Sequence, residues 1–410
     1  MNPTILFYLL IAIIIIKFLF DNLLNALNAK HYNDSLPKEL NDVYNEEEYL
    51  KSQKYKGVNY KFSLITSFFS LLLTLLFFAF DGFAFVDKIA NELSNNPILI
   101  TLLFFGIIFF VSDFISLPLA YYKTFVIEEK FGFNKTSKTT FFLDKIKGWV
   151  MLIMIGGGIL ALISYFYMIT TSNFWLYAWL LISIFSIFTN MFYSKLIVPI
   201  FNKQTPLENG ELKTAIENFA KKVGFKLKNV FVIDGSKRST KANAYFSGFG
   251  SQKRITLYDT LINDLNTDEI VAVLAHEVGH YKKKHIIYNL LLSIASMGFT
   301  LFILSLLVGN SQLSQALGVE HASFHIGLIA FGILYSPISE ITSFFMNALS
   351  RKFEYQADDF AKYSFDAEPL ISSLKKLSKN SLSNLTPSNL YVKFHYSHPT
   401  LLQRIKNLRK

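Results

Sequence analysis

The sequence contains no cysteine. This absence excludes disulfide bonds, thiolate metal sites and a cysteine nucleophile, so any metal ligands must be His, Asp or Glu side chains. Charged residues are also scarce, at 17% of 410 residues, whereas 51% are hydrophobic and 42 are Phe. Soluble domains rarely have this composition because they must also cover their surface. The composition is therefore typical of a membrane protein.

Several apolar runs are long enough to cross a bilayer, for which a helix needs about 20 apolar residues. We expect seven membrane helices, at residues 3–20, 62–80, 97–121, 149–169, 174–198, 287–308 and 323–345. The first run lacks a basic n-region and a cleavage site, so we interpret it as a membrane helix and not a secretory signal. Within these spans, we expect Asp113 to line a cavity and Lys17 to reach the cytoplasmic edge.

The loops alternate in positive charge, which is concentrated on the cytoplasmic side of membrane proteins. Residues 21–61 and 122–148 contain six Lys each, residues 81–96 contain only Lys88, and the links 170–173 and 309–322 contain no Lys or Arg. This pattern places the N-terminus outside and the polar segments 199–286 and 346–410 in the cytoplasm. We attribute the net charge of +10 to the Lys and Arg residues of the cytoplasmic segments. We expect no nucleic-acid partner, because no basic-aromatic binding module is visible.

The first polar segment has strand and helix patterns. An apolar run at Val230–Ile233 precedes two alternating segments, Asn243–Phe249 and Arg254–Tyr258, which predict a hairpin around Gly250–Gln252. We expect Thr267 to cap the next helix. We also expect this helix to continue into the sixth span, since no residue between His280 and Leu290 is a helix breaker.

That helix carries His276-Glu277-Val278-Gly279-His280, an HExxH pattern. Two His four residues apart project from one helix face toward the same metal, and the adjacent Glu can activate a bound water. The alternative is a buried His pair on an amphipathic helix. The pattern predicts a catalytic zinc site, which needs a third protein ligand from elsewhere in the sequence.

Glu354 is the best candidate for this third ligand. It shares one helix face with Arg351 and Asp358. An acid beside a ligand is chemically sensible, because ligating imidazoles often donate their second N–H to a carboxylate. An exposed ladder of ion pairs would give the same spacing, so both readings stay open at this point.

The remaining histidines do not predict a second metal site. His321 and His325 lie in or beside an outer loop, across the membrane from the HExxH helix, and we expect neither these nor His285 to bind metal. His395 lies close to His398 in sequence, and either lines the site or is a surface residue.

Together with several further blocks, these residues resemble the CAAX prenyl protease 1 family of integral-membrane zinc endopeptidases. The blocks include SRKFEYQAD, FVIEEKFGFNKT, PIFNKQTPL, DGSKRSTKANAYFSGFG and SHPTLLQRI, and they extend in family order from the third span to the C-terminus. Their combination is far more specific than any single motif.

The resemblance implies roles for individual residues. One Zn²⁺ would be held by His276, His280 and Glu354, with Glu277 as the general base. The supporting residues would be Asp358, which hydrogen-bonds a ligand, His398, which stabilises the oxyanion, and Arg404, which lies close to it. Asn243 and Ala244 would lie on an edge strand that pairs with the substrate backbone.

The resemblance also implies a mainly α-helical, multi-pass membrane fold. Seven transmembrane helices would form a barrel around a water-filled chamber, closed by a cytoplasmic gluzincin-type zinc metalloprotease domain with a small β-hairpin or sheet. We divide the chain into helices 1–5 with two cytoplasmic loops, the first part of the protease domain, helices 6–7, and the second part of the protease domain. These are residues 1–198, 199–286, 287–345 and 346–410.

The expected partners are membrane lipid and a peptide or protein substrate. The resemblance implies a more specific substrate, a protein with a prenylated C-terminal CAAX sequence, from which the last three residues are removed. A composition heavy in Lys, Asn, Ile and Phe favours a bacterial source and hence the bacterial plasma membrane, with the active site facing the cytoplasm. A eukaryotic chain would lie in the ER membrane. Quality control of unprenylated membrane proteins is the alternative function. A transporter is less favoured because no paired repeats are visible, and a scaffold is less favoured because the set of metal ligands is complete.

Overall fold

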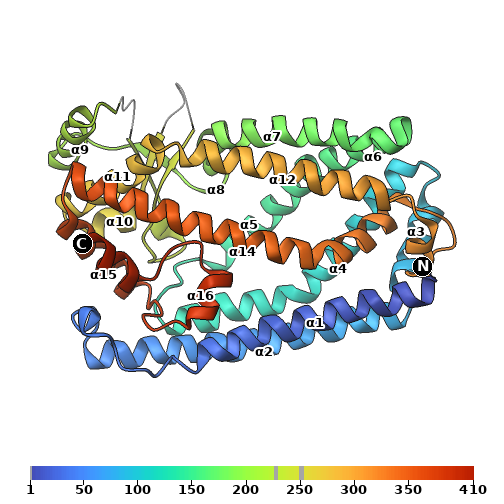
Figure 1. Ribbon diagram of the computed structural model, residues 1–410, viewed down its shortest axis with the longest axis horizontal. Coiled ribbons are helices and arrows are strands. Elements are labelled where there is room, and N and C mark those ends of the chain that lie inside the picture. The colour runs from blue at the N-terminus through green and yellow to red at the C-terminus, as the bar shows by residue number, and fades with distance from the viewer. Residues whose placement is uncertain (1, 226–229, 249–253) are drawn as a thin grey trace.

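The computed structural model describes residues 2–225, 230–248 and 254–410. Long helices run along the longest axis of the molecule, and most of the short helices and the sheet lie at one end (Figure 1). The C-terminus lies at that end and the N-terminus at the other. The protein is therefore mainly α-helical, as predicted.

Six helical segments of the described chain are long and apolar enough to cross a membrane. They are α1 (Pro3–Ala29), α2 (Glu46–Ala79), α4 (Pro97–Tyr122) with its π-helical continuation to Glu128, the stretch Lys138–Phe201, α12 (His285–Leu307) and α14 (Phe324–Ser364). The expected spans fall on these segments, and two of them fall on the single stretch Lys138–Phe201.

This 64-residue stretch is interrupted in its middle. It consists of α5 (Lys138–Met151), a π-helical segment (Leu152–Gly157), α6 (Gly158–Thr170), α7 (Phe174–Leu196) and α8 (Val198–Phe201). Thr171 has a positive φ of 45°, and α6 packs against α7. The chain thus folds back after α6, where the sequence predicts a link. The exact number of spans stays a prediction.

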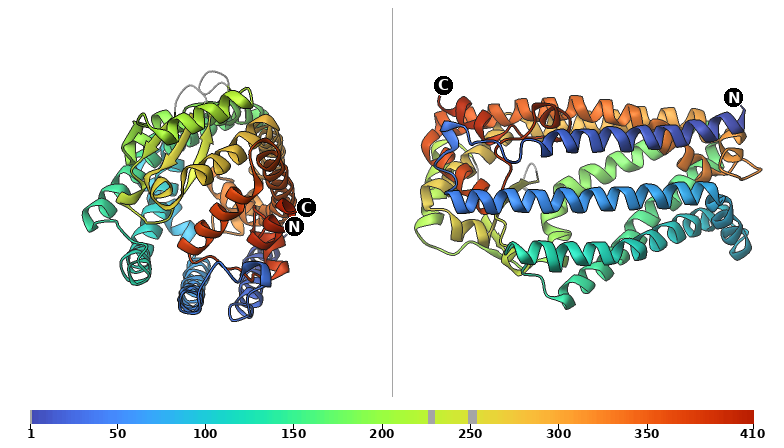
Figure 2. Two further views of the ribbon diagram at one scale, coloured as in Figure 1. Left: turned by 90° about the vertical axis from the view of Figure 1, so that its left-hand side faces the viewer. Right: turned by 90° about the horizontal axis from the view of Figure 1, so that it is seen from below.

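The long helices surround a centre when the molecule is seen end-on (Figure 2, left). Within the most apolar window of each candidate span, between 6% and 17% of the residues are buried. Helices of a tightly packed bundle would bury the face turned toward their neighbours. The low burial supports a barrel, whereas the water-filled chamber itself stays a prediction.

A four-stranded sheet lies at the polar end, in the order β1-β2-β4-β3. Its strands are β1 (Gln204–Pro206), β2 (Val230–Ile233), β3 (Ala244–Ser247) and β4 (Arg254–Tyr258). The antiparallel pairing of β3 with β4 confirms the predicted hairpin, whose turn residues Gly250–Gln252 lie outside the described residues. β2 pairs with β4 in parallel and with β1 in antiparallel fashion.

The remaining helices are short. Those of the polar end are α9 (Glu211–Lys222), α10 (Asp259–Asp264), α11 (Thr267–Lys282), α15 (Ala367–Asn380), α16 (Asn389–His395) and α17 (Leu401–Leu408), and those of the other end are α3 (Gly82–Leu93) and α13 (Ser311–Gln315). Single 3₁₀ turns occur at Lys38–Leu40, Thr171–Asn173 and Gly235–Lys237.

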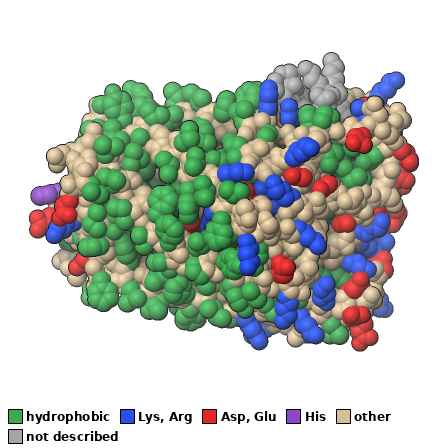
Figure 3. Space-filling view, turned by 180° about the vertical axis from the view of Figure 1, so that it is seen from behind, with side chains coloured by type: hydrophobic (Ala, Val, Ile, Leu, Met, Phe, Trp, Pro, Cys, Tyr) green, Lys and Arg blue, Asp and Glu red, His purple; other side chains and the backbone are tan. Residues whose placement is uncertain are grey.

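One hydrophobic core joins the polar end. Leu40, Ile127, Ile255, Leu274 and Ile405 each expose 2% of their surface or less and belong to the same cluster. The two Lys-rich loops therefore pack with both polar segments. On the face shown in Figure 3, hydrophobic side chains cover the long helices, and most Lys, Arg, Asp and Glu side chains lie over the other end.

Asp113 and Lys17, two charged residues inside the spans, have partners of opposite charge. Asp113 accepts hydrogen bonds from Lys145 Nζ, at 2.7 Å, and from Trp149 Nε1, at 3.0 Å. Lys17 Nζ lies 2.9 Å from Glu340 Oε2 on α14 and 3.2 Å from Asp21 Oδ2, one turn further along α1. Its extension toward the cytoplasmic edge stays a prediction. A partner of opposite charge lowers the cost of keeping each group in the membrane.

Candidate metal centre

The HExxH motif lies on α11, which begins with a capping box. The predicted cap was Thr267, but the N-cap is Asn266, whose side chain accepts a hydrogen bond from the backbone N–H of Glu269. The Glu269 carboxylate is buried and accepts hydrogen bonds from Ser372 Oγ and Lys376 Nζ of α15. These contacts fix the N-terminal end of α11 against α15.

The predicted continuation of α11 into the sixth span is wrong. The helix ends at Lys282, and Lys284 adopts a left-handed conformation with φ of 60° before α12 begins at His285. Lys rarely adopts this conformation, and no Gly or Pro marks the break in the sequence. The turn brings His285 back against His280 on the preceding helix.

The third candidate ligand lies on α14, which crosses α11 closely. A Cβ atom added to Gly279 would lie 3.1 Å from both Cα and the carbonyl oxygen of Ala357. Glycine at this position therefore lets the two helix backbones approach at the motif. The approach places Glu354 and Asp358, both buried, opposite the histidines.

Three potential ligand atoms converge in this space. His276 Nε2 lies 3.2 Å from His280 Nε2 and 3.3 Å from Glu354 Oε2, and His280 Nε2 lies 3.2 Å from Glu354 Oε1. Metal–ligand distances of about 2.0–2.1 Å in a tetrahedral site put ligand atoms about 3.3–3.4 Å apart. The three side chains therefore fit a single zinc ion.

The polar atoms around these ligands support the same conclusion. Glu354 Oε2 is buried and has no hydrogen-bond partner among the described residues. Burial and the nearby Arg404 favour the neutral form of His276, but its contacts with the Asp358 and Glu354 carboxylates outweigh them and raise the pKa of His276 to about 9. The pocket thus stabilises a positive charge between these side chains, where a metal cation would bind.

Hydrogen bonds orient both imidazole rings. His276 Nδ1 lies 2.9 Å from Asp358 Oδ1. His280 Nδ1 lies 3.0 Å from His285 Nδ1, and His285 Nε2 lies 2.8 Å from Gln356 Oε1. An amide oxygen only accepts, so His285 carries its proton on Nε2 and accepts from His280 at Nδ1. Both rings of the HExxH motif therefore turn Nε2 toward Glu354.

Arg404 on α17 places a positive charge beside the carboxylates of Asp358 and Glu354. It donates two hydrogen bonds to Asp358, at 2.9 and 2.5 Å, and its Nη1 lies 3.8 Å from Glu354 Oε2. Arg404 and Asp358 are both buried. A bidentate pair of this kind fixes the carboxylate that holds His276.

The remaining predicted residues surround the site. Glu277 is half-buried and has no hydrogen bond or ion pair in the described part of the chain. His398 Nε2 lies 3.4 Å from Glu354 Oε1, and its Nδ1 lies 2.9 Å from Ser397 Oγ. His395 lines the pocket of about 410 Å³ in which His398 lies.

Asn243 and Ala244 lie where the sheet ends. Ala244 is the first residue of β3, an edge strand of the described sheet, and the Asn243 carbonyl accepts a hydrogen bond from Tyr258 N. Phe246 of the same strand packs against Tyr281 of α11. The strand thus lies beside the motif helix with one edge unpaired by the described strands.

No second cluster of potential ligands occurs in the described residues. His325 is buried at the opposite end of the molecule and lies 2.6 Å from Asp87 Oδ1. His285 contacts a candidate ligand but does not join the group of three. Sequence reasoning missed this role because only the left-handed turn at Lys284 brings His285 close to His280.

Comparison with known proteins identifies the family. Residues 25–203 match the family described as "CAAX prenyl protease N-terminal, five membrane helices", and residues 206–410 match "Peptidase family M48". The chain is 35% identical to CAAX prenyl protease 1 of Saccharomyces cerevisiae over 96% of this chain and 93% of that protein. The chain belongs to the CAAX prenyl protease 1 family.

Other members of the CAAX prenyl protease 1 family are similar over nearly the whole length. The homologue from Dictyostelium discoideum is 38% identical over 92% of this chain and 89% of its own. The human homologue is 34% identical over 91% and 88% of the two chains. The crystal structure of S. mikatae Ste24p has a TM-score of 0.94 and 34% identity, and covers 99% of both chains.

These likenesses confirm the predicted class of protein. The chain is an integral, multi-pass membrane protein and a zinc metalloprotease of peptidase family M48. The family likeness and the group of two His and one Glu agree on a bound metal ion.

Proposed function

We propose that the protein removes the C-terminal tripeptide from polypeptides that end in a prenylated CAAX sequence, cutting after the modified cysteine. The observation that carries this proposal is the triangle of His276, His280 and Glu354, whose ligand atoms lie 3.2–3.3 Å apart. This triangle belongs to a chain that is similar over nearly its whole length to proteins named CAAX prenyl protease 1.

In this proposal one Zn²⁺ ion is held by these three side chains. A bound zinc ion lowers the pKa of water to about 7 and polarises a peptide carbonyl. Glu277, next to the ligand His276, accepts the proton of the attacking water and passes it to the leaving amine. Asp358 and Arg404 keep the His276 ring in the orientation that leaves Nε2 free.

His398 stabilises the developing oxyanion. Ser397 Oγ lies 2.9 Å from His398 Nδ1. In this proposal the Ser397 hydroxyl donates to Nδ1, so that the neutral ring carries its proton on Nε2. That nitrogen faces the metal centre, 3.4 Å from Glu354 Oε1, and can donate to an oxygen bound there.

The substrate backbone binds at the edge of β3. Extended peptides add to an unpaired sheet edge through main-chain hydrogen bonds. Asn243 and Ala244 lie where this edge begins, on the strand that packs beside α11. We infer that they pair with the residues that flank the cut bond.

The active site faces the cytoplasm in this proposal. The Lys-rich loops 21–61 and 122–148 pack in the same core as the two polar segments, and cytoplasmic loops carry the excess of positive charge. The compartment is the plasma membrane of a bacterium, or the ER membrane in a eukaryotic cell.

The test uses purified protein, a farnesylated CAAX peptide and its unprenylated twin, with cut sites located by mass spectrometry. We expect cleavage after the farnesylated cysteine, lost in Glu277→Gln and on addition of a chelator. Cleavage of the twin alone would instead support quality control of unprenylated proteins. No cleavage of either peptide would contradict the CAAX assignment.

A further inference from the structure

A groove between α1 and α14 is apolar on one side and charged on the other. It has a volume of about 480 Å³, within the usual range of ligand sites. Most of its lining side chains are apolar, among them Ile13, Ile16, Phe20, Pro337, Ile341 and Phe345. Ile16, Ile341 and Phe345 are about two-thirds exposed, so the groove opens to the surface of the membrane helices.

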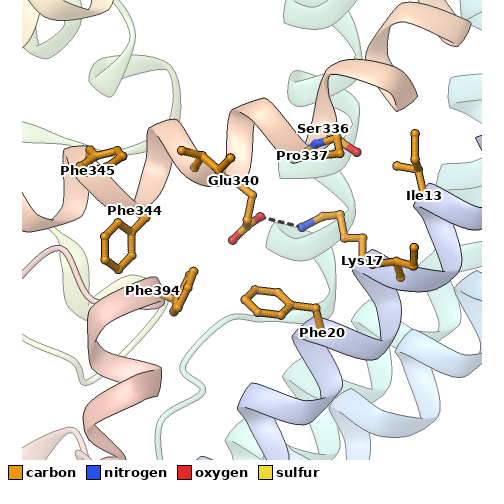
Figure 4. A pocket seen from close by; sticks show the side chains of 11 residues that line it. Ile13, Lys17, Phe20, Ser336, Pro337, Glu340, Phe344, Phe345 and Phe394 are labelled. Carbon is orange, nitrogen blue, oxygen red and sulfur yellow. Dashed lines mark hydrogen bonds and ion pairs between the residues drawn. The ribbon is translucent and has the colours of Figure 1, made fainter.

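Three aromatic rings close one end of the groove. The Phe394 ring of α16 lies 5.1 Å from the Phe20 ring of α1 and 5.0 Å from the Phe344 ring of α14. Figure 4 shows these rings beside the ion pair of Lys17 and Glu340, which point toward each other from the two helices. The ring cluster lies on the side of the groove nearer the protease domain.

The ion pair separates the groove from a polar pocket. Lys17, Glu340 and Phe394 also line a second pocket of about 560 Å³, together with Asn347 and His395. A charged pair in a membrane span is costly unless it faces water or a functional site. Its position here marks the boundary between a hydrocarbon environment and a polar one.

The polar pocket adjoins the pocket of His398, whose Nε2 lies 3.4 Å from Glu354 Oε1. His395 lines both this pocket and the pocket that contains His398. Glu340 and the candidate ligand Glu354 lie on the same helix, 14 residues apart, which corresponds to about 21 Å along its axis. Phe344, at the near end of the groove, is about 15 Å from Glu354 by the same rise per residue.

We propose that this groove binds the isoprenyl chain of the substrate. A branched hydrocarbon chain fits the Ile and Phe lining, and the polypeptide attached to it would pass Lys17 and Glu340 through the polar pocket toward His398. The inference rests on the proposed function, because it presupposes a lipid-modified substrate. The groove would then set the preference for prenylated over unprenylated peptides.

The first test fills the groove and measures both peptides. Ile341→Trp is expected to raise KM for the farnesylated peptide about tenfold and to leave kcat/KM for the unprenylated twin unchanged. The matched control is Ile338→Trp, on the same helix but outside the groove lining, which should change neither value. Equal effects of Ile341→Trp on both peptides, or none on either, would overturn the proposal.

The second test does not depend on turnover. A CAAX peptide whose isoprenyl chain carries a photoreactive diazirine is bound to full-length Glu277→Gln protein in lipid nanodiscs, and labelled residues are mapped by mass spectrometry. We expect labels within residues 13–20 and 337–345, removed by excess farnesylated peptide but not by added phospholipid. Labels elsewhere, or competition by phospholipid alone, would show that the groove is not the isoprenyl site.

The two tests separate this inference from the proposed function. Parent protein that cleaves neither peptide, although the diazirine labels the groove, would contradict CAAX cleavage and support the isoprenyl site. Parent protein that cleaves the farnesylated peptide while the label lies outside the groove would support CAAX cleavage and contradict the isoprenyl site.

Discussion

His280 Nδ1 donates a hydrogen bond to Nδ1 of His285, 3.0 Å away, across the turn between two helices. His285 is held in turn by Gln356 of α14 and stacks on the Phe353 ring. His285 is therefore a positioning residue for one of the three candidate metal ligands. It acts through His280 and does not belong to the ligand group itself.

We expect His285→Ala to weaken zinc binding about 10- to 100-fold, because groups that orient a ligating His contribute on this scale. The measurement is zinc competition with a chromogenic chelator, read without substrate. His321→Ala, in an exposed loop at the other end of the molecule, is the matched control and should bind zinc like the parent. Unchanged zinc affinity in His285→Ala would exclude this positioning role.

Glu277→Gln should lower kcat about 10²- to 10⁴-fold, which is the usual contribution of a general base. Because Glu277 is not in the ligand triangle, zinc content measured by atomic emission should stay at one ion per chain. His276→Ala should lose both zinc and activity. A Glu277→Gln protein that loses its zinc would instead place this side chain among the ligands.

Gly279→Ala should destabilise the protein by about 1–3 kcal/mol, since its Cβ would press on the backbone of Ala357 and overpacking costs this much. Gly332→Ala in α14 is the control, because its Cβ would meet no atom within 4 Å. Thermal unfolding in detergent measures both. Equal melting temperatures for the two variants would show that the helices do not need this close approach.

Acid should weaken the attachment of α11 to α15. Burial alone would raise the pKa of Glu269, but hydrogen bonds from Lys376, Ser372 and the Asn266 backbone outweigh it and lower the pKa below its ordinary value of 4.5. The stability that Glu269 contributes is therefore fully present above about pH 4.5 and is lost as pH falls through the lowered value.

The corresponding experiment compares melting temperatures of the parent and Glu269→Gln between pH 7 and pH 3. The variant should be less stable than the parent at pH 7, by about 1–3 kcal/mol, and the difference should shrink toward pH 3. A difference that stays constant with pH would rule out a contribution from the ionised carboxylate.

Local sequence patterns predicted the elements that depend on local physics. Apolar runs indicated the long helices, and alternation of apolar and polar residues indicated β3 and β4. Both patterns can be recognised within a short stretch of sequence. The HExxH spacing and Glu354 also identified three side chains that the structure brings together. The family likeness then confirmed the class of enzyme, while the roles of single residues stay predictions.

Features that depend on tertiary contacts could not be predicted in the same way. The break at Lys284 has no Gly or Pro signal, and the pair of Lys17 and Glu340 joins residues 323 positions apart. The parallel pairing of β2 with β4 likewise depends on packing between distant segments. Each of these results from the whole fold and not from a local preference.

The central claim is that His276, His280 and Glu354 hold one zinc ion. Anomalous diffraction from crystals of the purified protein, collected on both sides of the zinc absorption edge, tests it most directly. We predict a single peak at bonding distance from His276 Nε2, His280 Nε2 and the Glu354 carboxylate, absent from crystals of His280→Ala. A peak bound by other residues, or a zinc-loaded active enzyme with no peak between these three side chains, would contradict the account.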